Sequence, residues 1–112
     1  MAVVVEGAVR NVNKPYVDGT PCLEIHVPIR QADGLPLQIG ERVPIRLHIA
    51  DVEYQGGLRS TKANDYAWIS PDVYGLDGER MTLGRVLSEA GFGANDRVRL
   101  HVDGDSITVR WG

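Results

Sequence analysis

The fold is decided by a stretch near the C-terminus that reads Val98-Arg99-Leu100-His101-Val102-Asp103-Gly104-Asp105-Ser106-Ile107-Thr108-Val109. Two runs within it place an aliphatic residue at every second position, which is the pattern of a strand with one buried and one solvated face. Asp103-Gly104 lies between the runs, and this dipeptide is a strong signal for a tight hairpin turn. The stretch therefore predicts a β-hairpin that buries Val98, Leu100, Val102, Ile107 and Val109. With Asp103 and Gly104 as the two central turn residues, Arg97 is expected to face Arg110.

The same alternation recurs earlier in the chain, where aliphatic residues again occupy every second position. Gly7 is expected to form a bulge in the first of these strands, and Pro28 and Pro44 to lie at sheet edges or bulges. Further strands are expected at residues 2–10, 23–29, 43–49 and 66–69.

One segment has helical rather than strand periodicity. Thr82 fits an N-cap, and Gly91 supplies a C-terminal stop. A helix of about two turns is too short to be stable alone, so it is expected to cap a sheet. Short strands with one small helix predict a mostly β, single-domain pseudobarrel of about seven strands over residues 1–112. The apolar residues at helical spacing are Leu83, Val86, Leu87 and Ala90.

The composition excludes several classes of protein. The apolar run at the N-terminus, Ala2 to Val5, is too short to cross a membrane and lacks the basic lead-in of a signal peptide. A cytoplasmic location is therefore expected. Cys22 is the single cysteine, which excludes an intramolecular disulfide framework and a cysteine-based zinc site.

No catalytic constellation is recognisable in the sequence. The chain has no Gly-x-Ser-x-Gly nucleophile motif, and Pro71-Asp72 lacks the acid and lysine that would complete a nuclease motif. His26, His48 and His101 fall on the solvated side of expected strands, without the spaced second pair of ligands that a zinc site needs. We therefore expect neither catalysis nor a metal or cofactor within this chain.

Two segments concentrate the residue types that contact DNA. Residues 10–16 and 58–68 each combine arginine, lysine and asparagine with an aromatic residue. Arginine and lysine bond phosphates and guanine, asparagine bonds adenine, and threonine bonds phosphate. The candidate binding residues are Arg10, Asn11, Asn13, Lys14, Arg59, Thr61, Lys62, Asn64 and Tyr66.

The charge balance weakens the simplest DNA-binding interpretation. The net charge is −3, whereas nucleic-acid binders usually carry a basic patch. Ten of the twelve basic residues are arginine, whose planar fork suits phosphates and guanine edges, although a GC-rich genome would give the same bias. Solvated loops without any ligand are the competing interpretation for both segments.

Parts of the chain also resemble a known family. Residues 90–109, with a strand, a turn and a second strand, resemble the C-terminal part of pseudobarrel DNA-binding domains, and residues 54–70 resemble a basic arm of the plant B-three domain. That fold also forms the recognition domain of some restriction endonucleases. The resemblance implies a barrel without catalysis, in which two arms enter the major groove of duplex DNA like a wrench.

The leading hypothesis is a sequence-specific module for double-stranded DNA, such as the recognition domain of a restriction endonuclease, with a catalytic domain or another protein as a further partner. Residues 10–14 are expected to form one arm and residues 59–66 the other. The alternative is a protein-interaction or assembly barrel, since exposed aromatic residues are enriched in interfaces. The aromatic patch in that case consists of Tyr54, Tyr66 and Trp68.

Overall fold

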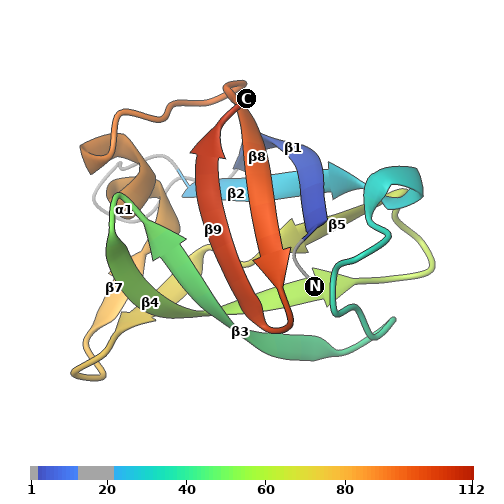
Figure 1. Ribbon diagram of the computed structural model, residues 1–112, viewed down its shortest axis with the longest axis horizontal. Helices are drawn as coiled ribbons and strands as arrows, with labels where there is room; N and C mark the ends of the chain where they lie inside the picture. Colours follow the sequence, from blue (N-terminus) through green and yellow to red (C-terminus); the bar gives the residue numbers. More distant parts are fainter. Residues whose placement is uncertain (1–2, 13–21) are drawn as a thin grey trace.

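A computed structural model describes residues 3–12 and 22–112. Within these ranges the chain forms nine strands and two short helices (Figure 1). The strands are β1 (Val3–Val12), β2 (Cys22–Pro28), β3 (Arg42–Ile49), β4 (Val52–Ser60), β5 (Tyr66–Ile69), β6 (Asp72–Gly75), β7 (Arg80–Thr82), β8 (Arg97–Asp103) and β9 (Ser106–Trp111). The helices are the 3-10 helix η1 (Ile29–Gln31) and the α-helix α1 (Leu83–Glu89).

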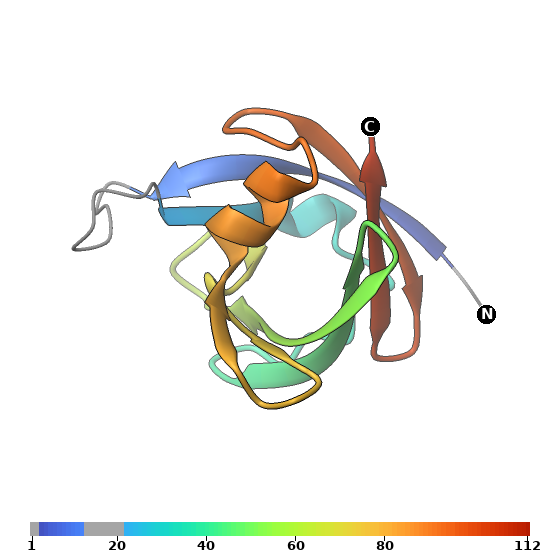
Figure 2. The same ribbon diagram turned by 90° about the vertical axis from the view of Figure 1, so that its left-hand side faces the viewer.

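Seven of the strands close into a barrel. Their hydrogen-bonded order is β3-β9-β8-β1-β2-β5-β4, and β4 pairs back onto β3. The hairpin of β6 and β7 continues from β4 and lies outside this ring. Figure 2 shows the strands wound around a common centre, with α1 across one end. The predicted mostly β, single-domain barrel with one short helix is confirmed.

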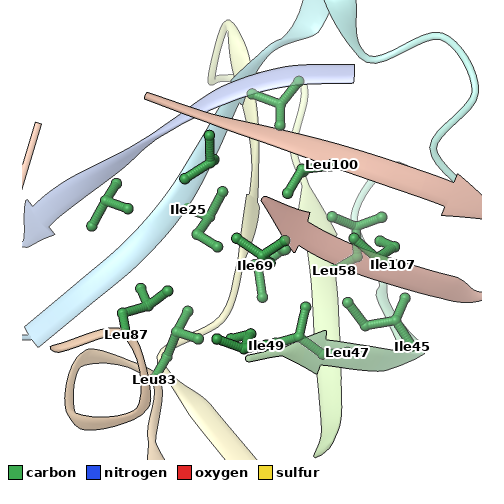
Figure 3. Packing of buried hydrophobic residues seen from close by; sticks show 14 of the residues in the cluster. Ile25, Ile45, Leu47, Ile49, Leu58, Ile69, Leu83, Leu87, Leu100 and Ile107 are labelled. Atoms are coloured by element: carbon green, nitrogen blue, oxygen red, sulfur yellow. The ribbon is translucent and has the colours of Figure 1, made fainter. Parts of the chain in front are cut away.

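The barrel interior is filled by the aliphatic residues that the alternation predicted (Figure 3). All five predicted core residues of the C-terminal hairpin are buried. In the strands predicted at 23–29 and 43–49, Val43 is only partly buried, and Ile29 is exposed because the chain has already turned into η1. A barrel of this size has an interior that side chains can fill, which leaves its outer surface for a ligand. The buried residues of β2 and β3 are Leu23, Ile25, Val27, Ile45, Leu47 and Ile49.

The helix α1 covers one end of the barrel as expected. Thr82 Oγ1 accepts a hydrogen bond of 3.3 Å from the Arg85 backbone N–H, which makes Thr82 the N-cap. Gly91 follows the helix with φ +93°, a left-handed conformation that suits glycine after a helix C-terminus. The apolar face of α1 packs into the core, and this burial stabilises so short a helix. The buried side chains are Leu83, Val86 and Leu87.

The turn of the C-terminal hairpin differs from the prediction by one residue. Asp103 pairs with Ser106, so the two central turn residues are Gly104 and Asp105. Gly104 has φ +61°, and a type II′ hairpin turn requires glycine at this first central position. The predicted placement of Asp103 and Gly104 at the centre of the turn is therefore wrong.

The shifted turn changes which arginines face each other. Arg110 lies opposite Arg99, and not opposite Arg97 as the sequence pattern predicted. On its other side Arg99 lies opposite Glu6 of β1. The outer surface of β1, β8 and β9 thus carries a row formed by Glu6, Arg99 and Arg110.

Gly7 allows close packing and does not form a bulge. The register between β1 and β8 runs through Gly7 without an inserted residue. A Cβ on Gly7 would lie 2.7 Å from the backbone oxygen of His26 in β2. The bulge prediction is wrong because the glycine is needed for the close approach of two backbones, which is the other use of glycine in strands.

The two prolines in strands lie where a sheet tolerates them. β3 pairs with β9 only over residues 46–48, and on that side the Arg46 N–H donates to the Asp105 oxygen at 2.8 Å. Pro44, two residues earlier, turns its nitrogen towards the same edge, where the missing N–H discourages pairing with another chain. Pro28 is the last residue of β2, a strand that pairs with β1 and β5, so it lies at a strand end and not at the predicted sheet edge or bulge.

We predict that Gly7→Ala lowers the free energy of unfolding by about 1–3 kcal/mol, because the new methyl group collides with backbone atoms of β2. Gly56→Ala is the matched control. Gly56 is also a glycine within a strand, but its Cβ would meet Ile45 at an ordinary 3.6 Å. Urea unfolding followed by circular dichroism measures both changes, and equal stability of the two variants would contradict the proposed close approach at Gly7.

Candidate functional site

A groove of about 770 Å³ runs along the outside of the barrel. It lies over β1, β2 and the start of β5, between η1 on one side and the start of β8 on the other. Its volume lies within the range of pockets that hold small ligands. The residues around it are Glu6, Gly7, Ala8, Arg10, His26, Pro28, Ile29, Arg30, Gln31, Asp65, Tyr66 and Arg97.

Two features create the groove. Small residues form its floor, and the chain changes direction beside it. Ala8 presents only a methyl group on the outer surface of β1, and its neighbour Gly7 has no side chain. β2 ends at Pro28, and the chain turns into η1, where the Ile29 N–H donates to the Asp65 backbone oxygen at 2.8 Å. This hydrogen bond holds η1 against the start of β5, so η1 forms one side of the groove.

Three arginines contribute to the groove without forming ion pairs. Arg10, Arg30 and Arg97 are exposed, and within residues 3–12 and 22–112 no carboxylate forms an ion pair with any of them. Arg10 donates to the Asn95 side-chain oxygen at 2.9 Å, which fixes the guanidinium near one end of the groove. The carboxylates of the groove are those of Glu6 and Asp65.

Three of the arginines outside the groove form ion pairs, whereas Arg42, Arg59, Arg99 and Arg110 form none with a carboxylate of residues 3–12 and 22–112. Arg46 pairs with Asp105 at 3.2 Å, and Arg85 pairs with Glu89 at 3.1 Å. Arg80 likewise pairs with Asp72. The groove therefore has three arginines that form no ion pair within the described residues, which leaves their charge available for an anion.

An aromatic cluster, defined as His26, Tyr66 and Trp68, borders the groove. The rings of His26 and Tyr66 stack with centroids 4.2 Å apart and planes 13° apart. Trp68 lies beside Tyr66 at 5.7 Å with a tilt of 59°. The alternation of β5 explains this placement, because Ala67 and Ile69 face the core and turn Tyr66 and Trp68 outwards. Glu24 Oε1 lies 2.9 Å from His26 Nε2 and holds the imidazole in place.

The structure brings two of the predicted binding residues into this groove. Arg10 and Tyr66 both line it, although they come from the two separate segments. Asn11 is exposed beside Arg10 near the end of β1. Asn13 and Lys14, two further predicted residues, lie outside the described residues.

The remaining predicted residues lie at the β4–β5 connection, away from the groove. Arg59 is exposed on β4 and lies opposite Trp68 of β5. Lys62 and Asn64 belong to the connection itself, where Lys62 is exposed and Asn64 partly buried. Thr61 Oγ1 is buried without a hydrogen-bond partner in the described part of the chain.

The polar segment 58–68 was expected to interrupt the strand pattern until the strand predicted at 66–69, which the structure confirms as β5, but its first residues also belong to a strand. Residues 58–60 complete β4 and residues 66–68 begin β5, so the loop spans only 61–65. Leu58 is fully buried, and its alternation with Gly56 and Ser60 is the signal of a strand that the polar composition obscured.

The two predicted arm segments meet β2 at opposite ends. Val12, in the first segment, pairs with Cys22 at the start of β2. Tyr66, in the second, pairs with Pro28 at its end. Arg10 and Tyr66 therefore approach the groove along different strands, in an arrangement that residue composition alone does not encode.

Tyr54 lies apart from the aromatic cluster. It pairs with Leu47, whose side chain is fully buried, and it packs against the core from β4. Trp68 lies opposite Arg59, five residues further along β4 and on the outer face. The predicted patch of Tyr54, Tyr66 and Trp68 is therefore wrong in one member, and His26 takes its place.

Three residues of the site were missed by sequence reasoning. Arg30 and Arg97 stand outside both polar segments, and His26 was treated as a solvated strand residue. The proximity of these side chains depends on strand pairing, since Ala8 lies opposite Arg97 on one side and His26 on the other. The only sequence signal for His26 and Arg97 was that they occupy the solvated positions of the alternating pattern.

Other ionisable clusters do not form a metal site in the part of the chain that the structure describes. His48 is engaged by Glu53 at 2.8 Å and lies 3.3 Å from Ser106 Oγ. Among the same residues no helix has the length and apolar character needed to cross a membrane.

Comparison of the chain with models of known protein families, with curated proteins and with solved structures gives no match.

Proposed function

We propose that this domain binds DNA through the outer groove. The observation that carries the proposal is the set of three unneutralised arginines around one groove that is also bordered by stacked aromatic rings. Arginine offers a planar fork of donors that matches phosphate oxygens, and aromatic rings offer a surface for bases.

The acidic net charge is compatible with this function because binding depends on local charge. Charges further away than a Debye length of about 8 Å are largely screened at physiological ionic strength. A phosphate in the groove meets Arg10, Arg30 and Arg97 against the two carboxylates of Glu6 and Asp65. The net charge of −3 comes from acids spread over the rest of the chain.

The connection between β4 and β5 extends the proposed DNA contact. Arg59 is exposed beside Trp68, and no carboxylate in the described ranges forms an ion pair with it. Sequence-specific reading by this region, with Arg59 on a base edge and Lys62 on a phosphate, is part of the proposal. The family resemblance implies a recognition domain of a restriction endonuclease. In such an enzyme another domain cleaves the DNA.

A second candidate function is docking of a protein partner on the aromatic cluster. The observation that favours it is the side-by-side position of Tyr66 and Trp68 with Arg59, since aromatic residues and arginine are enriched in interfaces. The two functions differ in their response to salt. DNA affinity falls steeply with ionic strength, whereas docking on an aromatic surface depends on it weakly.

We predict that Arg97→Ala weakens DNA binding for every sequence and lowers the slope of log affinity against log salt by about one. Fluorescence anisotropy with labelled oligonucleotides at several salt concentrations measures both quantities. Arg85→Ala is the matched control, because Arg85 is exposed on α1 and paired with Glu89. Equal losses for Arg97→Ala and Arg85→Ala would show that the groove is not the binding site.

We predict that Arg59→Ala and Lys62→Ala affect binding in different ways. Arg59 is held on a strand, so its loss is expected to relax selection at one base pair, where a bidentate contact contributes about 1–3 kcal/mol of discrimination. Lys62 lies in the connecting loop, and its loss is expected to weaken all sequences alike. Selection from a randomised duplex library measures the difference, and unchanged selectivity and affinity in the double variant would remove this region from the DNA contact.

A further inference from the structure

The stacked rings at the groove raise the question of which form of DNA they would contact. In a duplex both faces of each base are covered by neighbouring base pairs, so an aromatic side chain has no base face to stack on. An unpaired strand exposes these faces, and proteins that bind single strands use aromatic rings as stacking surfaces within basic grooves. We propose that the groove takes an unpaired DNA strand, with one base against the His26–Tyr66 pair and the phosphates on the arginines of β8 and β9. This inference rests on the proposed function.

The aromatic pair is built as a fixed surface. His26 covers one face of Tyr66 with nearly parallel planes, and Glu24 holds His26 through its Nε2 atom. Both rings line the groove, and Ala8, the cross-strand neighbour of His26, leaves space above the floor. A base that lies against this pair extends an existing stack, so few side chains lose conformational freedom on binding.

The groove has a volume suited to one or two nucleotides. Its volume of about 770 Å³ lies within the range of pockets for small ligands. The major groove of a duplex is read by an inserted helix or ribbon. The α-helix of the described chain lies across one end of the barrel and contributes no residue to this groove.

The sugar-phosphate backbone of the proposed DNA strand has a path out of the groove along β8. Arg97 and Arg99 project from the same outer face of β8, two residues and thus about 6.7 Å apart. Successive phosphates of an extended strand have a similar spacing. Glu6, which lines the groove, lies opposite Arg99, so this arginine stands directly beside the groove.

The pairing of Arg99 with Arg110 supports a phosphate at that position. The two residues lie directly opposite each other in the β8–β9 hairpin. Like charges in such positions destabilise a sheet, and within the described ranges neither arginine forms an ion pair with a carboxylate. A phosphate between them converts the repulsion into two attractions. The arginine pair therefore continues the anion path that starts at Arg97.

The inference is tested with labelled oligothymidylate of about ten nucleotides, offered alone and as a duplex with oligoadenylate, in fluorescence anisotropy. We predict that the unpaired strand binds about tenfold more tightly than the duplex. Tyr66→Ala is expected to weaken binding of the single strand about tenfold or more, while Tyr66→Phe retains it, because stacking needs the ring and not the hydroxyl. Tyr74→Ala, which removes an exposed tyrosine of β6, is the matched control.

A second pair of variants tests the backbone path without touching the aromatic cluster. Arg99→Ala and Arg110→Ala are each expected to lower the salt slope for the single strand by about 0.7, the value for one phosphate contact. Both residues are exposed, so these variants keep their fold, and thermal unfolding verifies this.

The outcomes separate the two proposals. Equal or tighter binding of the duplex, or a Tyr66→Ala variant that binds the single strand like wild type, overturns the inference and leaves DNA binding standing. Salt slopes unchanged in both Arg99→Ala and Arg110→Ala overturn the proposed backbone path. Binding of neither form at low salt overturns the proposed function itself.

Discussion

The whole barrel depends on one short parallel contact between β3 and β9. Every other neighbouring pair in the ring is antiparallel, and this contact alone joins the C-terminal hairpin to the middle of the chain. It spans residues 46–48 of β3 and is anchored by the hydrogen bond from the Arg46 N–H to the Asp105 oxygen. Closure removes the exposed edges of the sheet over this length and gives the aliphatic side chains a common interior.

Closure also determines what the outer face can do. Side chains alternate strictly between the interior and the solvent along a strand, so a register that buries Val98 and Leu100 necessarily exposes Arg97 and Arg99. The same rule turns Tyr66 and Trp68 outwards because Ala67 and Ile69 are buried. The arginine path and the aromatic cluster are thus consequences of the core, and a slip of one residue in either strand would destroy both.

The sequence alone was enough to predict the structural features that depend on residues close together along the chain. The alternation at residues 23–29 and 43–49 and the N-cap at Thr82 are local patterns, and the structure confirms the buried strands and the helix that they predicted. The turn at Gly104 shows the limit of such reasoning. Two adjacent turn placements satisfy the same local pattern, and the choice between them moves the arginine opposite Arg110 by two residues.

The candidate site could be predicted only in part, because it is assembled from separate strands. Arg10 and Tyr66 were recognised from the polar segments around them, and both line the groove. Arg97 and His26 were missed, since each became part of the site through its pairing with Ala8. Composition also misassigned residues 58–60 to a loop, because polar residues on the outer face of a strand and polar residues in a loop look alike when few positions are compared.

The distribution of ion pairs explains how an acidic chain can present an anion site. Opposite charges on neighbouring strands stabilise a sheet, as Arg80 of β7 and Asp72 of β6 do at 3.0 Å. Arg99 faces Glu6 on one side and Arg110 on the other, and the pairing of two arginines costs stability in the free protein. Such a cost is compensated when a ligand places negative charge between the two side chains. The ability of this barrel to bind an anion therefore depends on which arginines lack an ion pair with a carboxylate, and not on the net charge of the chain.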